Sequence, residues 1–366
     1  MTRLRPTWIQ VDLDAIRHNV RLLKPERAQL MAVVKGDAYG HGDVPVARVA
    51  LEAGATWIGV ALVEEGLGLR DAGIDAPVLV LSEFPPGSER AALAAELTPS
   101  LYTDAGLARL THAAQGREVG VHVKVDTGMH RVGVYPPGAT TGFVHRVAAA
   151  SLRLDALWTH FASSTEDEKT TRLQLKTFLA VVEDVRAAGH RPGLLHAANS
   201  GAMILDPETH LDLVRPGIAI YGVEPGGGAG ADLGLRPALS WRSAVTMTRR
   251  LPAGEAVSYG HRYRLERDAN IATVPVGYAD GYPRLLSSRA DVLIRGQRCH
   301  VAGSVTMDQL MVDCGDLEVE AGEDVVLLGR QGSQTVSAEE LAGLAETISY
   351  EIVAGIGGRV PREYVG

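Results

Sequence analysis

The sequence predicts an α/β fold, a (β/α)8 barrel followed by a mainly β C-terminal domain. Short apolar runs alternate with stretches of helical periodicity over residues 30–220, as in a parallel sheet covered by helices. Beyond a glycine-rich segment at 225–237 the helical pattern gives way to strand-like segments. The length of 366 residues also suggests two domains, at about 150 residues each. We expect the barrel in residues 1–230 and the β domain in residues 231–366.

Eight apolar runs supply the strands of the predicted barrel. Most are rich in β-branched residues and nearly continuous in apolar character, as strands buried on both faces must be. In chain order they span 30–35, 57–62, 77–82, 97–102, 119–126, 152–161, 193–199 and 211–216. An open doubly wound sheet is the alternative, but its G-x-G-x-x-G signature is missing from the sequence.

The C-terminal part of the chain has the pattern of a β domain. The segments LSWRSAVTMTRRL, IATVPVGYADG, DVLIRGQRCHVAG, TMDQLMVD and DVVLLG are strand-like and are separated by turn residues. Only SAEELAGLAE has helical periodicity. The glycine-rich segment PGGGAGADLGLRP before them is therefore interpreted as a linker.

Composition excludes several classes of function. The chain has 36 Lys and Arg against 44 Asp and Glu, a formal charge of −8, so we expect no nucleic-acid partner. No apolar run reaches ~18 residues, so no membrane-spanning helix is expected. The N-terminus lacks the apolar stretch of a signal peptide. The only cysteines, Cys299 and Cys314, form no close metal-type pair, which predicts no metal site, no disulfide framework and a cytoplasmic location.

Polar residues interrupt the apolar runs where a barrel performs its chemistry. Barrel active sites form at the C-terminal ends of the strands. Lys35 ends the first run, Lys124 lies within the fifth, His160 ends the sixth, Asn199-Ser200 the seventh, and Arg215 the eighth. A single strand-end lysine is usually only solvated. Five such positions on one face predict an active site.

Lys124 is the most unusual of these residues. In VHVKVDTG, strand alternation places His122, Lys124 and Asp126 on one face. A lysine within a buried strand must be paired or neutralised. Taken alone, the pattern favours a structural Lys124–Asp126 pair.

The last two strands offer an anion site. Barrels often bind phosphate with the loops after strands seven and eight, where Ser200-Gly201 and Pro216-Gly217-Ile218 lie. The alternative is that Gly217 only makes a tight turn. A phosphate site opposite a strand-end lysine suggests pyridoxal phosphate, with Lys35 bound to the aldehyde as a Schiff base.

A set of motifs runs through the whole chain. In order they are VVKGDAYGHG, HVKVDTGMHRVGV, WTHFA, HAANSGA, VRPGIAIYG, VSYGHRY, GYADGYPR, VTMDQ and RVPREY. Together they resemble the motifs of the alanine racemase family, whose members are fold-type III pyridoxal-phosphate enzymes, and VVKGDAYGHG resembles that family's pyridoxal-lysine motif. The ordered set covers both predicted domains, so the resemblance implies an isomerase that interconverts L- and D-alanine and supplies D-alanine for peptidoglycan.

The resemblance implies two bases. Lys35 would carry pyridoxal 5'-phosphate and act on one face of the substrate, and Tyr259 would act on the other, as racemisation requires. A free tyrosine has a pKa near ~10, so Tyr259 needs a polarising neighbour, which in the family is a chain through His160 to Arg215. Arg215 would donate to the pyridine nitrogen, and because arginine keeps its proton, that nitrogen would stay unprotonated.

The resemblance also assigns the binding residues. The phosphate would be held by Tyr39, Ser200, Tyr350 and the backbone of Gly217 and Ile218. The substrate would meet Arg131, the backbone N–H of Met307, and Tyr278, which narrows the entrance together with Tyr350. Lys124 would be carbamylated and paired with Arg131. The family is a head-to-tail homodimer, so Tyr259, Tyr278 and Met307 would serve the partner's cofactor.

One departure and two alternatives remain. Ser304 stands where the family usually has an arginine lining the entrance. A racemase of the same fold with a broader amino-acid range is one alternative, although Tyr350 and Tyr278 favour a small side chain. A non-catalytic pyridoxal-phosphate-binding protein is the other. Such single-barrel proteins lack the β domain, so Tyr259 and the residues after the linker argue against it.

Overall fold

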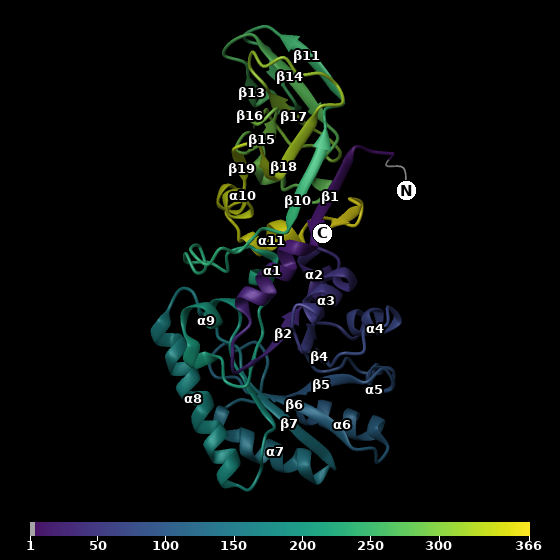
Figure 1. Cartoon of the computed structure of the whole chain (residues 1–366), viewed down its shortest axis with the longest axis vertical. Helices are drawn as coiled ribbons and strands as arrows, with labels where there is room; N and C mark the ends of the chain where they lie inside the picture. Colours follow the sequence, from purple (N-terminus) through teal and green to yellow (C-terminus); the bar gives the residue numbers. More distant parts are fainter. Residues whose placement is uncertain (1–3) are drawn as a thin grey trace. The chain divides into compact units, whose positions relative to one another are not determined.

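A computed structural model describes residues 4–366 and divides them into two compact units (Figure 1). One unit comprises Ile16–Ala38 and Asp43–Leu235 and is called the barrel unit here. The other comprises, within the described residues, 4–15, Tyr39–Gly42 and Arg236–Gly366 and is called the β unit. Both units are therefore discontinuous in sequence.

The barrel unit confirms the predicted fold class. Its eight strands pair in the order β8-β7-β6-β5-β4-β3-β2-β9, and every adjacent pair is parallel. Each predicted apolar run overlaps one strand. Their bounds are β2 Gln29–Val33, β3 Trp57–Val60, β4 Val78–Val80, β5 Leu97–Leu101, β6 Val119–Lys124, β7 Leu152–Trp158, β8 Leu194–His196 and β9 Leu213–Val214. Backbone hydrogen bonds close the ring between β8 and β9, from Arg215 N–H to Ala198 O and from Asp212 N–H to Leu195 O, both 3.0 Å.

Helices follow the strands around the barrel. They are α1 Leu13–Leu23, α3 Asp43–Glu52, α4 Val63–Asp71, α5 Glu89–Ala94, α6 Asp104–Ala114, α7 Thr140–Ala149, α8 Glu168–Ala187 and α9 Ser200–Leu205. Several begin at residues whose side chains accept a hydrogen bond from the first turn. Thr103 caps α6 and Asp167 caps α8, which explains why the helical pattern starts where it does. Asn199 caps α9 in the same way.

The β unit confirms the mainly β C-terminal domain. Its main sheet has the order β11-β14-β17-β16-β15-β18-β10-β1-β20, with β19 paired to β18, and β12 and β13 form a separate hairpin. The bounds are β1 Thr7–Asp12, β10 Leu239–Ala244, β11 Met247–Leu251, β12 Ala256–Val257, β13 Tyr263–Arg264, β14 Ala269–Val274, β15 Asp291–Ile294, β16 Gln297–Val301, β17 Leu310–Asp313, β18 Asp324–Gln331, β19 Gln334–Val336 and β20 Arg362–Val365. Two helices accompany the sheet, α10 Ala338–Ala345 and α11 Ser349–Ala354.

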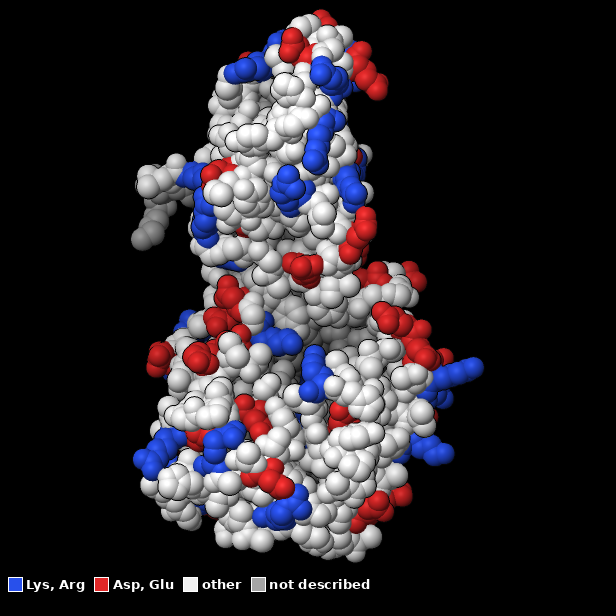
Figure 2. All heavy atoms as spheres, turned by 180° about the vertical axis from the view of Figure 1, so that it is seen from behind, with Lys and Arg blue, Asp and Glu red and all other residues white. Residues whose placement is uncertain are grey.

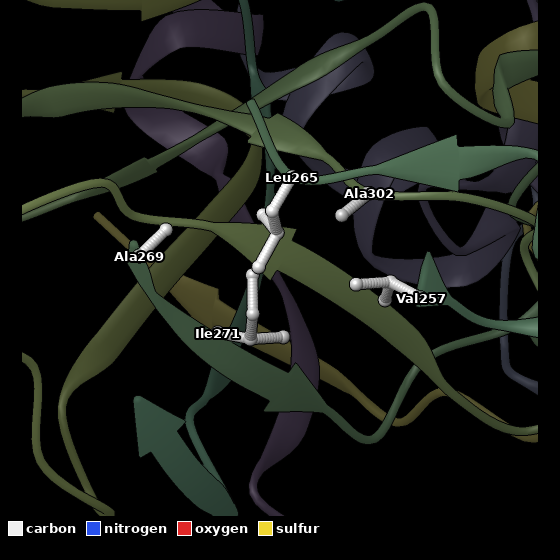
Figure 3. Close-up of a cluster of buried hydrophobic side chains, with 5 residues drawn as sticks. All are labelled: Val257, Leu265, Ala269, Ile271 and Ala302. Carbon is white, nitrogen blue, oxygen red and sulfur yellow. The ribbon is translucent and has the colours of Figure 1, made fainter. Parts of the chain in front are cut away.

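A small apolar cluster forms part of the core of the β unit. Val257, Leu265, Ala269, Ile271 and Ala302 are all buried and pack together (Figure 3). They come from the β12–β13 hairpin, from β14 and from the segment after β16. The hairpin is thereby fixed to the main sheet just before Ser258 and Tyr259.

Strand β1 shows a pairing that the sequence analysis does not include. It pairs antiparallel with β10 and parallel with β20, so the start of the chain lies in the sheet of the β unit. Burial alternates along TWIQVD, as expected for a strand with one covered face. The barrel strands have no such alternation, and this difference distinguishes the two kinds of strand.

Charged side chains of both signs occur together on the surface. On the face shown in Figure 2, basic and acidic side chains are interspersed. Across residues 4–366, no helix combines the length and apolar character needed to cross a membrane.

Candidate active site

Lys35 lies at the first residue of an unusual turn, α2 (Lys35–Gly40), that follows β2. The four residues Gly36–Tyr39 have φ between 52° and 63°, so the turn is left-handed. That conformation costs roughly 1–2 kcal/mol for each residue other than glycine. It is held by Gly36 N–H donating to Glu65 Oε1 (2.7 Å) and by Ala38 N–H donating to Val34 O (2.8 Å). Strained turns of this kind are found where a side chain must be aimed, here Lys35.

The surroundings of Lys35 favour its neutral form. Burial lowers the pKa of its amine, and the positive charge of Arg131 lowers it further, while Glu65 opposes both. A neutral amine is the form that attacks an aldehyde and accepts a proton. Burial and Arg131 therefore both shift the Lys35 amine toward that form.

Lys124 is buried within β6, with only 3% of its surface exposed. Its Nζ lies 4.3 Å from the centroid of the Trp158 ring. Burial lowers the pKa of Lys124 to about 7, and Arg131 and Arg215 contribute to the shift. Its amine is thus largely neutral just above pH 7. Whether Lys124 forms the structural pair expected from the sequence depends on the hydrogen-bond partners of Asp126.

Asp126 forms no ion pair with Lys124 in the described structure, so the interpretation as a structural pair is wrong. Its Oδ1 instead accepts hydrogen bonds from the backbone N–H groups of residues 128, 129 and 130, at 2.9, 3.1 and 3.0 Å. Asp126 therefore shapes the turn that leads to Arg131. Strand alternation alone could not reveal this. The Lys124 amine and the backbone N–H groups of residues 128–130 all lie within a few residues of Asp126, so the sequence allows either as the partner of its carboxylate.

Arg215 is buried at the end of β9, with 3% of its surface exposed. Its Nη1 donates to His196 Nδ1 (2.8 Å), and its Nη2 donates to Thr159 O (2.8 Å) and Ala197 O (2.9 Å). The predicted contact with His160 is present as a longer bond, 3.4 Å from Nη2 to Nδ1. Within residues 4–366 the Nε–H of Arg215 has no acceptor, so this donor is available to another group.

A chain of buried histidines continues behind Arg215. His196 Nε2 lies 3.1 Å from His122 Nδ1. Because arginine can only donate, His196 Nδ1 must accept, and its proton lies on Nε2 and is donated to His122. Burial, with Arg215 next, lowers the pKa of His196 well below its ordinary value and that of His122 to about 3. Both rings are therefore neutral at pH 7.

His196 was not predicted as a site residue. A signal was present, since His196 interrupts the apolar run GLLHAAN as His160 interrupts the preceding one. Trp158 was also missed. Its ring stacks on His196 with centroids 5.4 Å apart, and the Arg215 guanidinium carbon lies 4.9 Å from its centroid.

The predicted anion site brings together the loops after β8 and β9. Ser200 is buried at the start of α9, and its Oγ accepts hydrogen bonds from Gly217 N–H (2.9 Å) and Ala219 N–H (3.4 Å). Ile218 lies between them and is fully buried. The hydroxyl and the backbone N–H groups therefore converge, as binding of a phosphate requires.

Tyr39 and Tyr350 lie together in the β unit, with ring centroids 6.1 Å apart. Burial raises the pKa of Tyr350 to about 12 and raises that of Tyr39 as well. Both hydroxyls therefore keep their protons at neutral pH. Two protonated hydroxyls can donate to an anion.

Three further predicted residues line one open pocket of the β unit. Tyr259, Tyr278 and Met307 all face it, with exposed fractions of 75%, 43% and 54%. Their positions are linked, because Ser304 Oγ donates to Tyr259 O (3.2 Å) and Tyr278 N–H donates to Thr306 O (3.0 Å). Tyr259, Tyr278 and Met307 therefore lie on one connected and exposed surface of the single chain.

Burial of Lys124 predicts a dependence of stability on pH. Its pKa is about 7 in the folded chain and 10.5 ordinarily, so between these values the unfolded chain binds the extra proton. Raising the pH through this range should therefore increase the free energy of unfolding, by up to about 5 kcal/mol relative to Lys124→Met. Denaturant unfolding of both proteins in carbonate-free buffer measures the difference. Parallel pH profiles would contradict it.

Two family models together match nearly the whole chain. The model described as "Alanine racemase, N-terminal domain" matches residues 11–225, and the one described as "Alanine racemase, C-terminal domain" matches residues 238–364.

Individual proteins give the same result. An alanine racemase of Symbiobacterium thermophilum is 50% identical over 373 residues, covering 99% of this chain and 98% of that protein. The crystal structure of alanine racemase from Streptomyces lavendulae, a D-cycloserine producer, aligns with a TM-score of 0.94 at 42% identity, covering 100% and 98% of the two chains. That of Bacillus anthracis with bound L-Ala-P aligns with a TM-score of 0.94 at 38% identity, covering 100% and 96%.

Proposed function

Since the chain belongs to the alanine racemase family and is an isomerase that interconverts L- and D-alanine, we propose that it works with pyridoxal phosphate and uses Lys35 and Tyr259 as its two bases. The observation that carries the proposal is the setting of Lys35, a neutral-leaning amine aimed from a strained turn at the mouth of the barrel. We also propose that its D-alanine serves peptidoglycan synthesis in the cytoplasm.

The residues present fit the cofactor. Ser200 and the backbone of Gly217 and Ile218 suit its phosphate, with the hydroxyls of Tyr39 and Tyr350 as further donors. When bound, pyridoxal phosphate withdraws electrons from the substrate's Cα and so acidifies the proton there.

Arg215 suits the ring nitrogen of the cofactor. Nη1 and Nη2 of Arg215 both donate to acceptors, whereas Nε is the guanidinium nitrogen that donates to none within residues 4–366. Burial lowers the pKa of Arg215 to about 9, which still keeps it charged at neutral pH. Arg215 therefore retains its proton rather than transferring it, and this limits how strongly electrons are withdrawn. Fast return of the proton to Cα, and few side reactions, are the expected consequence.

Lys35 and Tyr259 divide the proton transfer between them. Lys35 Nζ takes or gives the Cα proton on one face, and the Tyr259 hydroxyl does so on the other. His160, held against Arg215, is the residue that we assign to polarise Tyr259. An inversion at Cα needs both bases, because one base would return the proton to the face it left.

We propose that Arg131 binds the substrate carboxylate and that Lys124 positions Arg131 for this contact. A neutral Lys124 amine can add to carbon dioxide, forming a N–C bond and releasing one proton to give a carbamate. This anion would pair with Arg131, and Arg131 and the Met307 N–H would then bind the alanine carboxylate. Two observations support this assignment. Lys124 is buried, and no carboxylate of residues 4–366 forms an ion pair with its amine. A ¹³C-bicarbonate NMR signal that is lost in Lys124→Ala would test it.

We propose that the enzyme is a head-to-tail homodimer with shared active sites. Tyr259, the proposed second base, is 75% exposed in the single chain, and Tyr278 and Met307 are also largely exposed. An exposed base cannot exclude water from the proton transfer, so we expect another protein surface to cover Tyr259. We propose that this covering surface is the barrel of a second copy, which carries Lys35.

The central test is the position of the cofactor. We expect purified protein to be yellow, and borohydride to fix the cofactor covalently on Lys35, because reduction makes the lysine–aldehyde linkage permanent. Peptide mapping by mass spectrometry locates the label. Lys124 is the internal control, since it is the other buried lysine with a lowered pKa. A label on any residue other than Lys35 would refute the assignment.

Tyr350→Ala should relax the substrate range and weaken cofactor binding. Tyr350 is assigned both a phosphate contact and the narrowing of the entrance, so its removal affects both. We expect kcat/KM for amino acids larger than alanine to rise by about 10-fold or more relative to alanine, since one methylene in a pocket is worth about 10-fold at the least. Tyr350→Phe is the matched control, which keeps the ring and should change only cofactor affinity. An unchanged substrate profile would exclude Tyr350 as the gate and would favour a broader native range.

A further inference from the structure

The only two cysteines of the chain lie opposite each other in the β unit. Strands β16 and β17 pair antiparallel, with His300 opposite Asp313 and Val301 opposite Val312. Continuing this register by one position places Cys299 opposite Cys314. The two strands are neighbours in the main sheet (Figure 1).

The hydrogen bonds define the kind of pair. Ala302 N–H donates to Met311 O (2.7 Å), so 302 and 311 are a hydrogen-bonded pair. Hydrogen-bonded and non-hydrogen-bonded pairs alternate along an antiparallel ladder, so Cys299 and Cys314 form a non-hydrogen-bonded pair. Consistently, Cys314 N–H points to the other neighbour and donates to Asn270 O (2.9 Å).

This type of pair has the spacing that a disulfide needs. Opposite residues in non-hydrogen-bonded pairs have Cα atoms about 4.5 Å apart and the closest side chains of the ladder. Disulfides require Cα separations of roughly 4.4–6.8 Å. Both strands can therefore stay in register while the two sulfurs bond.

The side chains also point to the same side of the sheet. Burial alternates along β16 and β17, and both cysteines fall on the buried face with 5% and 7% of their surface exposed. The two thiols influence each other's protonation, since Cys314 lowers the pKa of Cys299, while Cys299 together with burial raises the pKa of Cys314. Cys299 is thus the better nucleophile of the pair.

We propose that Cys299 and Cys314 are a modification site at which a small hydroperoxide forms a reversible disulfide. The Cys299 thiolate attacks one oxygen of hydrogen peroxide, giving a sulfenic acid and hydroxide. The Cys314 thiol then attacks that sulfur, and the hydroxyl leaves as water. In total, two thiols and one peroxide give one disulfide and two waters, with the sulfurs oxidised and the peroxide oxygens reduced. Hydrogen peroxide is close to water in size, which suits a buried pair.

The location gives the bond a structural effect. The cysteines flank the base of the β16–β17 loop, residues 302–309, which carries Ser304, Thr306 and Met307. These residues line the open pocket around Tyr259. Oxidation would therefore link the two ends of the loop covalently at its base, while the reduced protein holds them only by strand pairing.

The test uses the full-length protein with its cofactor. The reduced protein is treated with hydrogen peroxide, quenched with catalase, unfolded and alkylated, and then analysed by intact and peptide mass spectrometry. We expect both cysteines to resist alkylation, a mass lower by about 2 Da per chain apart from methionine oxidation, and a Cys299–Cys314 cross-linked peptide. Dithiothreitol should restore both thiols. Cys299→Ser and Cys314→Ser should each form no intrachain bond.

A register control separates this geometry from general flexibility. In Cys314→Ser, Val312→Cys moves the second thiol two residues along the same face of β17, to a diagonal position about 7–8 Å from Cys299. This variant should form no intrachain disulfide under the same treatment. Cross-linking by the control, or two alkylatable thiols in peroxide-treated wild type, would overturn the proposal. Cross-links between chains in place of the intrachain bond would overturn it as well.

Discussion

Lys35→Ala should lower kcat for alanine racemisation by about 10⁴-fold or more, because it removes both a proton-transferring group and the covalent attachment of the cofactor. The amine cannot be replaced by a neighbour within the barrel, since Lys124 is enclosed against Trp158 and next to Arg131. The rate is measured in both directions with an enantiomer-specific oxidase. Added methylamine should restore a small part of the activity, since it can accept the proton in the vacated space.

A matched variant shows that the loss is local. Lys176→Ala removes an exposed lysine from α8 and should keep wild-type activity. Circular dichroism of Lys35→Ala should match the wild type. A Lys35→Ala protein that retains activity within about 10-fold of wild type would contradict the assignment of Lys35 as a base.

The second large effect is recovery of activity in a mixture of two inactive variants. If Lys35 and Tyr259 serve one site from different subunits, Lys35→Ala and Tyr259→Phe homodimers have only impaired sites. In a mixed dimer one site carries both substitutions and the other carries neither. Random exchange makes about half of the dimers mixed, so activity should return to roughly a quarter of the wild-type value.

Subunit exchange itself has to be demonstrated for this experiment. Differently tagged variants, purified through both tags in sequence, report the fraction of mixed dimers. Wild type mixed with Tyr259→Phe gives the reference for a single intact site per dimer. If mixed dimers are recovered and activity stays at the level of the two parents, Lys35 and Tyr259 act within the same chain, and the cross-subunit placement is wrong.

Local sequence patterns were sufficient for the barrel and for the residues at its mouth. The eight apolar runs each became a strand because a parallel strand covered on both faces needs a continuous apolar stretch, a property of the run itself. Lys35, Ser200 and Arg215 were found in the same way, as polar residues at the ends of such runs. The family motifs then supplied Tyr259 and Met307, which no local pattern distinguishes from ordinary surface residues.

The partners of these residues were decided only by the tertiary structure. Sequence alternation places Lys124 and Asp126 on one face, yet β6 ends at Lys124 and Asp126 binds the turn that follows, because backbone N–H groups satisfy a carboxylate as well as an amine does. His196 and His122 meet through strands that are far apart in sequence.

The same is true of strand pairing in the main sheet of the β unit. Strand β1 pairs with β10 and β20 through registers set between segments that are distant in sequence, and the register of β16 with β17 places Cys299 opposite Cys314. The sequence determined by itself which segments become strands and which residue types stand at their ends, because periodicity and burial are local. It could not determine which strand lies beside which, because that depends on closing loops of many residues at once and on satisfying every buried backbone group together.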